Sequence, residues 1–208
     1  MRSEVIVIGA GGHAKVCIEL LRAMGEKVDF CVGGPDSSDH CLDVPVLIGD
    51  ENLPRLRSQG YGKLFVAVGW NELRDRLGGI ATELGYRLVN AISPRAVVSP
   101  TAKLGVGVAV MAGAVINADA VVEDLAVINT GATVDHDCWI GKAVHVAPQC
   151  ALAGNVTVGS HTLLGIGCKV IVGIKIGERV TVGAGGVVIS AIESGATAVG
   201  IPVRIIAR

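Results

Sequence analysis

The stretch Ile128-Asn129-Thr130-Gly131-Ala132-Thr133-Val134-Asp135-His136-Asp137-Cys138-Trp139-Ile140 has a branched apolar residue at every sixth position, 128, 134 and 140. Followed in both directions, this register continues without interruption through sixteen positions, each of which is Leu, Ile or Val. They are Val98, Leu104, Val110, Ile116, Val122, Ile128, Val134, Ile140, Val146, Leu152, Val158, Leu164, Val170, Ile176, Val182 and Val188. The position four residues after each is mostly small, as at Ala114 and Cys150. Because a strand alternates with period two, a period of six predicts short strands separated by corners, the pattern of a hexapeptide β-helix.

The composition agrees with a repetitive β architecture. Half of the 208 residues are apolar, yet aromatic residues make up only 3% and there are 29 glycines, so the core must be built from small aliphatic side chains. The net charge is −1, which leaves no broad cationic field, so we expect neither nucleic acid nor a membrane surface as partner. The chain shows no secretory signal and no apolar stretch long enough to span a bilayer, and we expect a cytoplasmic protein. Its six cysteines form no Cys-x-x-Cys pair and are interpreted as reduced, structural thiols.

Residues 1–92 follow a different pattern and are predicted to form a small α/β, Rossmann-like domain, with the β-helix domain spanning 93–208. Strands alternate with helices in this part, which indicates a small parallel sheet. The stretch from Pro35 to Asp50 is rich in Gly, Pro, Asp and Ser and is predicted to be a loop. The predicted strands are Val5–Ile8, Val28–Val32, Leu64–Val68 and Tyr86–Ile92, and the predicted helices run to about Met24 and over Asn71–Leu84.

A glycine-rich turn, Gly9-Ala10-Gly11-Gly12-His13-Ala14-Lys15, follows the first predicted strand and opens a helix. In that context backbone N–H groups and the helix dipole hold a phosphate group. A dinucleotide site would also need an acidic residue after the second strand, where this chain has Gly33-Gly34. We therefore favour the phosphates of a nucleotide sugar, while a dinucleotide site and a merely structural turn stay open.

Polar residues interrupt the β-helix repeat at Asp135-His136-Asp137, between two inward positions, so these side chains must lie outside the helix. Neighbouring carboxylates raise the pKa of an imidazole and orient its ring, which suits a general base near neutral pH. His145 lies half a coil further on, and in one chain the two histidines point away from each other. They could form one site only across a subunit boundary. Gly154 follows His136 by 18 residues, one full coil, on the same edge of the helix.

Together these motifs resemble the sialic-acid O-acetyltransferase-like family of bacterial sugar acetyltransferases, and within it the N-acetyltransferases of GDP-perosamine and of the UDP-4-amino sugar of bacillosamine synthesis. The resemblance spans nearly the whole chain. Besides the glycine-rich turn and the hexapeptides, it rests on the segments 128–138, Ala153-Gly154-Asn155-Val156 and Gly200-Ile201-Pro202.

The resemblance implies a homotrimer of left-handed β-helices, each preceded by a domain that binds a nucleotide-linked amino sugar, with acetyl-CoA as co-substrate and no metal. It implies His136 as the catalytic base and Asp137 as the acid beside it. The substrate-binding residues that it implies are Gly11, Gly12, His13, Lys15, Asn71 and Asn129. The acetyl-CoA-binding residues that it implies are His145, Gly154, Lys169, Lys175, Gly185 and Arg204.

Three alternatives to sugar N-acetylation stay open on the sequence. His136 could activate a hydroxyl group, which would make the protein a sugar O-acetyltransferase. A trimeric zinc hydratase of the γ-carbonic-anhydrase kind could use His136, His145 and His161 as ligands, although the acids beside His136 suit a base better. The chain could also bind nucleotide sugars without catalysis.

Overall fold

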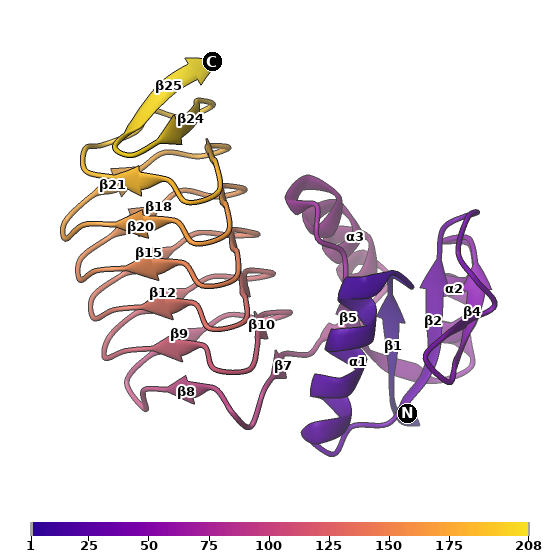
Figure 1. Ribbon diagram of the computed structural model, residues 1–208. Coiled ribbons are helices and arrows are strands. Elements are labelled where there is room, and N and C mark those ends of the chain that lie inside the picture. The colour runs from indigo at the N-terminus through magenta and orange to yellow at the C-terminus, as the bar shows by residue number, and fades with distance from the viewer. Residues whose placement is uncertain (1, 208) are drawn as a thin grey trace. The chain divides into compact units, whose positions relative to one another are not determined.

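The computed structural model describes residues 2–207, which form two compact units. The first unit ends at Pro94 and the second begins at Arg95. The first is an α/β unit and the second a left-handed parallel β-helix, which confirms the predicted fold class (Figure 1).

The α/β unit has a sheet with the strand order β3-β4-β2-β1-β5-β6, parallel except for the pair β3 and β4. All four residues at the end of β1 are buried, as in a parallel sheet covered by helices. The strands are β1 (Arg2–Ile8), β2 (Val28–Gly33), β3 (His40–Cys41), β4 (Val44–Ile48), β5 (Tyr61–Val66) and β6 (Arg87–Leu88). The helices are α1 (Gly12–Ala23), α2 (Asn52–Ser58) and α3 (Asn71–Glu83), and the short strand β7 (Ala91–Ile92) follows β6.

The predicted loop from Pro35 to Asp50 is wrong in part, because it contains β3 and β4. The apolar run Val44–Ile48 pairs in parallel with β2, and this pairing, rather than local propensity, makes it a strand. The sequence also did not indicate α2, whose seven residues are too few to show a helical period. The predicted strand Tyr86–Ile92 is divided between β6 and β7.

The chain leaves β1 through α1 to reach β2 on one side, and it later returns to place β5 on the other side of β1. The carboxyl ends of β1 and β5 therefore form the topological switch point of the sheet, where ligands of open α/β folds bind. The helices α1 and α3 both begin there, directly after these two strands.

The β-helix has three faces, and each coil of 18 residues adds one strand to each, since Val115 pairs with Thr133 and Val121 with Trp139. Face 1 consists of β8 (Val97–Val98), β11 (Val115–Ile116), β14 (Thr133–Val134), β17 (Ala151–Leu152), β20 (Lys169–Val170) and β23 (Val187–Val188). Face 2 consists of β9 (Lys103–Leu104), β12 (Val121–Val122), β15 (Trp139–Ile140), β18 (Thr157–Val158) and β21 (Lys175–Ile176). Face 3 contains β10 (Ala109–Val110), β13 (Val127–Ile128), β16 (His145–Val146), β19 (Leu163–Leu164), β22 (Thr181–Val182) and β24 (Thr197–Gly200), and β25 (Val203–Ala207) pairs antiparallel with β24.

The inward positions of the hexapeptide register form the core of this unit. Of the sixteen, only Val98 and Leu104 in the first coil are half-buried, and the others are buried. Cys138, Cys150 and Cys168 occupy three of the small inward positions. All six cysteines are buried and free. The inward assignment of the repeat is confirmed.

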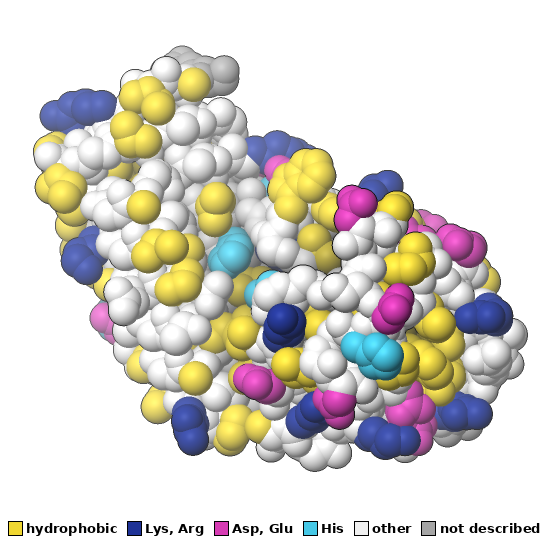
Figure 2. Space-filling model, turned by 45° about the vertical axis from the view of Figure 1, so that its right-hand side comes forward, with side chains coloured by type: hydrophobic (Ala, Val, Ile, Leu, Met, Phe, Trp, Pro, Cys, Tyr) yellow, Lys and Arg dark blue, Asp and Glu magenta, His cyan; other side chains and the backbone are white. Residues whose placement is uncertain are grey.

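The surface carries mixed charges. On the side of the molecule in Figure 2, Lys and Arg side chains are interspersed with Asp and Glu over the α/β unit. None of the helices formed by residues 2–207 has the length and apolar character that crossing a membrane requires.

Candidate functional site

His136 lies at the corner where the chain passes from face 1 to face 2, which we call corner 1–2. The corner is held by backbone hydrogen bonds between coils, because Asp137 N–H donates to Ala118 O (3.0 Å) and Asn155 N–H donates to His136 O (3.0 Å). Asp137 has a φ of 57°, a left-handed conformation that Asp and Asn adopt more readily than most residues. The imidazole points outward, with 53% of the side chain exposed, as the sequence predicts.

Two carboxylates surround the imidazole. Asp137 Oδ2 lies 2.7 Å from His136 Nδ1, and this hydrogen bond, together with the nearby Asp135, raises the pKa of His136. Asp135 Oδ1 accepts hydrogen bonds from the His136 backbone N–H (2.8 Å) and from Asn117 Nδ2 (2.8 Å), and these hold the pKa of Asp135 below its usual value. With Nδ1–H donating to Asp137, the lone pair of Nε2 is left to accept a proton.

Gly154 lies directly beside the imidazole, one coil further along corner 1–2. A Cβ atom at this position would be 2.6 Å from both Cε1 and Nε2 of His136, so only glycine leaves room for the ring. Within residues 2–207, no group accepts a hydrogen bond from the Gly154 N–H, whereas its carbonyl accepts from Gly173 (3.0 Å). The base and a backbone donor therefore lie side by side.

His145 and Asn129 form a second polar pair, on face 3 and at the corner between faces 3 and 1. Asn129 Nδ2 lies 2.9 Å from His145 Nε2. In a three-faced helix corner 1–2 is opposite face 3, so the fold places this pair on the other side of the helix from His136. His161 lies at the corner between faces 2 and 3, with a φ of 61°. One chain therefore does not gather the three histidines, and residues 2–207 contain no cluster of three metal-binding side chains.

The predicted acetyl-CoA residues of the later coils are spread over several faces. Lys169 is exposed on face 1 and Lys175 on face 2, so they lie on either side of corner 1–2, one coil beyond Gly154. Gly185 lies at the corner between faces 3 and 1, with a φ of 68°. Arg204 is exposed on β25 and donates to the carbonyl of Val203 (3.0 Å).

The glycine-rich turn of the α/β unit lies at the switch point. Gly9 has a φ of 116°, and a Cβ there would be 2.5 Å from the carbonyl oxygen of Ala67, so Gly9 is required by the packing of the two turns. Gly11 and Gly12 are exposed, and a Cβ at either would meet nothing within 4 Å. The fold itself does not require these two glycines, which leaves close approach of a ligand to the backbone as their physical role.

Behind this turn lies a buried polar cluster. His13 Nε2 is 3.6 Å from Cys17 Sγ, and burial, together with the charge of Arg74, lowers the pKa of His13 to about 4. Asn71 is buried in the first turn of α3 and accepts a hydrogen bond from Arg74. Lys15 is exposed in the first turns of α1. Of the predicted substrate-binding residues, the structure thus brings His13 and Asn71 to one end of the sheet, where Arg74 donates to Asn71 and its charge acts on His13.

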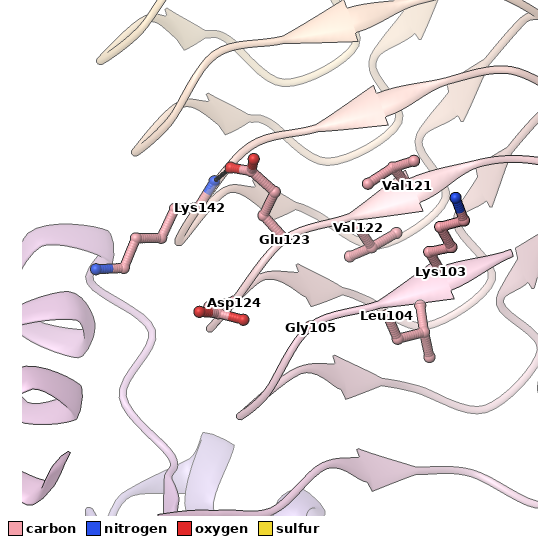
Figure 3. Close-up of a pocket in the computed structure, with 8 residues that line it drawn as sticks. All are labelled: Lys103, Leu104, Gly105, Val121, Val122, Glu123, Asp124 and Lys142. Atoms are coloured by element: carbon pink, nitrogen blue, oxygen red, sulfur yellow. Dashed lines mark hydrogen bonds between the residues drawn. The ribbon is translucent and has the colours of Figure 1, made fainter.

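A pocket of about 420 Å³ lies elsewhere, at face 2 and its corner with face 3 (Figure 3). Lys103 and Lys142 lie at its edges, and the Lys142 backbone N–H donates to Glu123 Oε2 (2.8 Å). None of the predicted site residues lines it.

Two residues that support the site were not found by sequence reasoning. Asn117 is one coil before Asp135, and the 18-residue period could have identified it. Arg74 had no such signal, because an arginine three residues into a helix ordinarily lies in solvent.

Known proteins resemble the chain over its whole length. A family model described as the PglD N-terminal domain matches residues 4–78. The crystal structure of PerB from Caulobacter crescentus in complex with CoA and GDP-perosamine is 53% identical, with a TM-score of 0.95 over 99% of this chain and 98% of that chain. The acetyltransferase domain of PglB from Neisseria gonorrhoeae, in complex with acetyl coenzyme A, is 37% identical, with a TM-score of 0.92 over 99% of this chain and 100% of that chain.

Curated relatives match about half of the chain and are themselves longer proteins. A serine acetyltransferase from Synechococcus elongatus is 38% identical over 113 residues, which is 53% of this chain and 42% of the relative. The chain thus spans less than half the length of this relative.

Proposed function

This chain belongs to the sialic-acid O-acetyltransferase-like family of bacterial sugar acetyltransferases, and on that premise we propose that it transfers the acetyl group of acetyl-CoA to the 4-amino group of a nucleotide-linked amino sugar. A sugar like GDP-perosamine is favoured, because the 53% identical relative was crystallised with that compound. The observation that carries the proposal is the packing of His136, with its Asp137 partner, against Gly154.

The chemistry follows from that packing. The amine must attack as a free base, and His136 Nε2 takes its proton while Asp137 holds Nδ1–H. As the C–N bond forms, negative charge collects on the former thioester oxygen, and the Gly154 N–H is the donor we assign to it. The carbon–sulfur bond then breaks, and the CoA thiolate takes up the proton from His136.

Transfer is direct, without an acyl-cysteine intermediate. Cys138 is the thiol closest in sequence to the base, but it is 1% exposed and donates to Ala153 O (3.2 Å) inside the helix. Burial raises its pKa, so it is a poor nucleophile.

We assign nucleotide-sugar binding to the switch point of the α/β unit. The exposed Gly11 and Gly12 at the start of α1 suit the diphosphate, and the half-buried His13 and the buried Asn71 supply further hydrogen bonds. Asn129 is assigned to the acceptor sugar.

The proposal includes a homotrimer, because His136 and the Asn129–His145 pair lie on opposite sides of one helix. In a parallel three-fold assembly, corner 1–2 of one copy meets face 3 of the next, and acetyl-CoA lies between them. We place Lys169, Lys175, Gly185 and Arg204 along this boundary, with the three cations near the phosphates of CoA. The expected location is the cytoplasm, where the six free thiols stay reduced.

The test is the release of thiol from acetyl-CoA in the presence of GDP-, UDP- and dTDP-linked 4-amino sugars, with His136→Asn as the comparison. We expect release with one amino sugar and a loss of about 10²- to 10⁴-fold in kcat for the variant, the usual contribution of a general base. Release only with hydroxyl acceptors would instead assign O-acetylation, and full activity of the variant would remove His136 from its role.

A further inference from the structure

Arg74 is the only fully buried charged side chain among residues 2–207, with an exposed fraction of 0%. Burying a guanidinium is costly unless its donors are satisfied, and the burial lowers the pKa of Arg74 to about 10. The chemistry proposed above makes no use of this residue. A buried charge on the first turn of α3 therefore needs a physical reason.

Three hydrogen bonds of the guanidinium go to one turn. Nη1 donates to Val68 O (2.9 Å) and Gly69 O (3.0 Å), and Nη2 donates to Asn71 Oδ1 (2.8 Å). The backbone N–H of Arg74 donates to Trp70 O (2.9 Å). One side chain thus ties the residues after β5 to the start of α3.

This turn lies next to the glycine-rich turn. The Ala67 N–H donates to Ile8 O (2.7 Å), and the missing Cβ of Gly9 is what lets the carbonyl of Ala67 approach. The two turns together form the edge of the switch point, and Trp70, at 66% exposed, stands on it. Arg74 holds the Val68–Asn71 turn through its three hydrogen bonds.

We propose that Arg74 is a positioning residue of the nucleotide-sugar site, which sets the Val68–Asn71 turn and the Asn71 amide against the glycine-rich turn without touching the ligand. This inference rests on the proposed function. The planar fork of arginine reaches three acceptors at once, whereas a lysine would keep the charge and lose the geometry.

The electrostatics agree with that role. The charge of Arg74 acts on His13 across the cluster, adding to the effect of burial, so the His13 imidazole is neutral at pH 7 and can both donate and accept a hydrogen bond. Cys17 is the other titratable group beside the imidazole, and burial raises its pKa to about 12, so it stays a neutral thiol. The negative charges of Glu72 and Asp75 act on the Arg74 guanidinium and favour its charged form.

The experiment uses Trp70 as the reporter of the turn. The chain has two tryptophans, so Trp139→Phe leaves Trp70 as the only one. In this background Arg74→Lys is compared with Arg76→Met, a control that removes an exposed arginine two residues further along α3. Melting temperature, acrylamide quenching of Trp70, and titrations with GDP, UDP and dTDP are measured, along with KM for both substrates and kcat.

For Arg74→Lys we expect a folded protein with easier quenching of Trp70 and a rise in KM for the nucleotide sugar of roughly 10- to 100-fold, as for a displaced binding group. KM for acetyl-CoA should stay unchanged, and Arg76→Met should match the parent. Unchanged nucleotide binding in a folded Arg74→Lys protein would overturn the proposal. So would failure of Arg74→Lys to fold while Arg76→Met folds, since Arg74 would then serve the fold alone.

These outcomes are separate from those of the proposed function. If the parent protein transferred no acetyl group to any amino sugar, the nucleotide titrations would still show whether Arg74 positions a nucleotide site. If no nucleotide bound to the parent protein, the inference would fail even in an active enzyme.

Discussion

Gly154→Ala isolates the contact between the base and the neighbouring coil. The added methyl carbon would lie 2.6 Å from Cε1 and Nε2 of His136 and 3.2 Å from Cδ2. Carbon atoms in contact prefer about 3.5–4.0 Å, so the edge of the ring must move away by about 1 Å. The φ of Gly154 is outside the left-handed range, so alanine brings no backbone strain.

The expected result is a loss of rate without a loss of stability. A displacement of about 1 Å at a reacting group costs about 100-fold in kcat, which corresponds to about 2.7 kcal/mol in the barrier. The melting temperature should stay the same or rise slightly, because glycine-to-alanine changes at compatible positions stabilise the folded state. The assay is steady-state thiol release with the productive amino sugar, alongside calorimetry.

A double variant decides whether the loss acts through the imidazole. In the His136→Asn background, Gly154→Ala should have little further effect on kcat, because no imidazole is left to displace. Gly79→Ala is the control. A Cβ at Gly79 meets nothing within 4 Å, and this residue lies in α3 of the α/β unit rather than in the β-helix. Wild-type kcat for Gly154→Ala, or an equal loss in the His136→Asn background, would refute the reasoning.

Three further predictions concern protonation and packing. Asp137→Asn keeps a residue suited to a φ of 57° but removes the charge that raises the pKa of His136. The acidic limb of the profile of kcat/KM against pH should therefore move to lower pH. An unmoved limb would contradict the pairing of His136 with Asp137. Ile140→Asp places a carboxylate at a position that is 0% exposed, and the β-helix should lose its cooperative melting transition, whereas an unchanged transition would mean that the register is wrong. Burial lowers the pKa of His13 to about 4 in the folded state. As the pH falls below about 6.5, His13 is therefore protonated in the unfolded state but not in the folded state. The free energy of unfolding should drop by up to about 3 kcal/mol at pH 4. His13→Asn should lack this part of the pH dependence in urea unfolding at pH 7 and pH 4.5.

Part of the candidate site followed from spacing alone. Asp135, His136 and Asp137 lie between two inward positions, so their outward direction was determined by the repeat, and the 18-residue coil put Gly154 on the same edge. That His136 packs against Gly154 closely enough to exclude a Cβ was not predictable, because it depends on the side-chain rotamer. The roles of Lys169, Lys175, Gly185 and Arg204 remain predictions.

The α/β unit was less predictable. Val44–Ile48 is a strand because it pairs with β2, although the composition of the flanking residues predicted a loop. Arg74 is buried because α3 packs over the end of β5, where carbonyls of Val68 and Gly69 accept its hydrogen bonds.

The amino-acid sequence by itself determined the β-helix, since every hexapeptide must bury the same two positions and a local rule repeated sixteen times leaves little choice of fold. It also determined that the chain has a second, α/β part with a glycine-rich turn between its first strand and first helix. Only the tertiary structure decided which polar groups are buried, paired or exposed. Those properties depend on contacts between residues far apart in the chain, and neither composition nor period records such contacts.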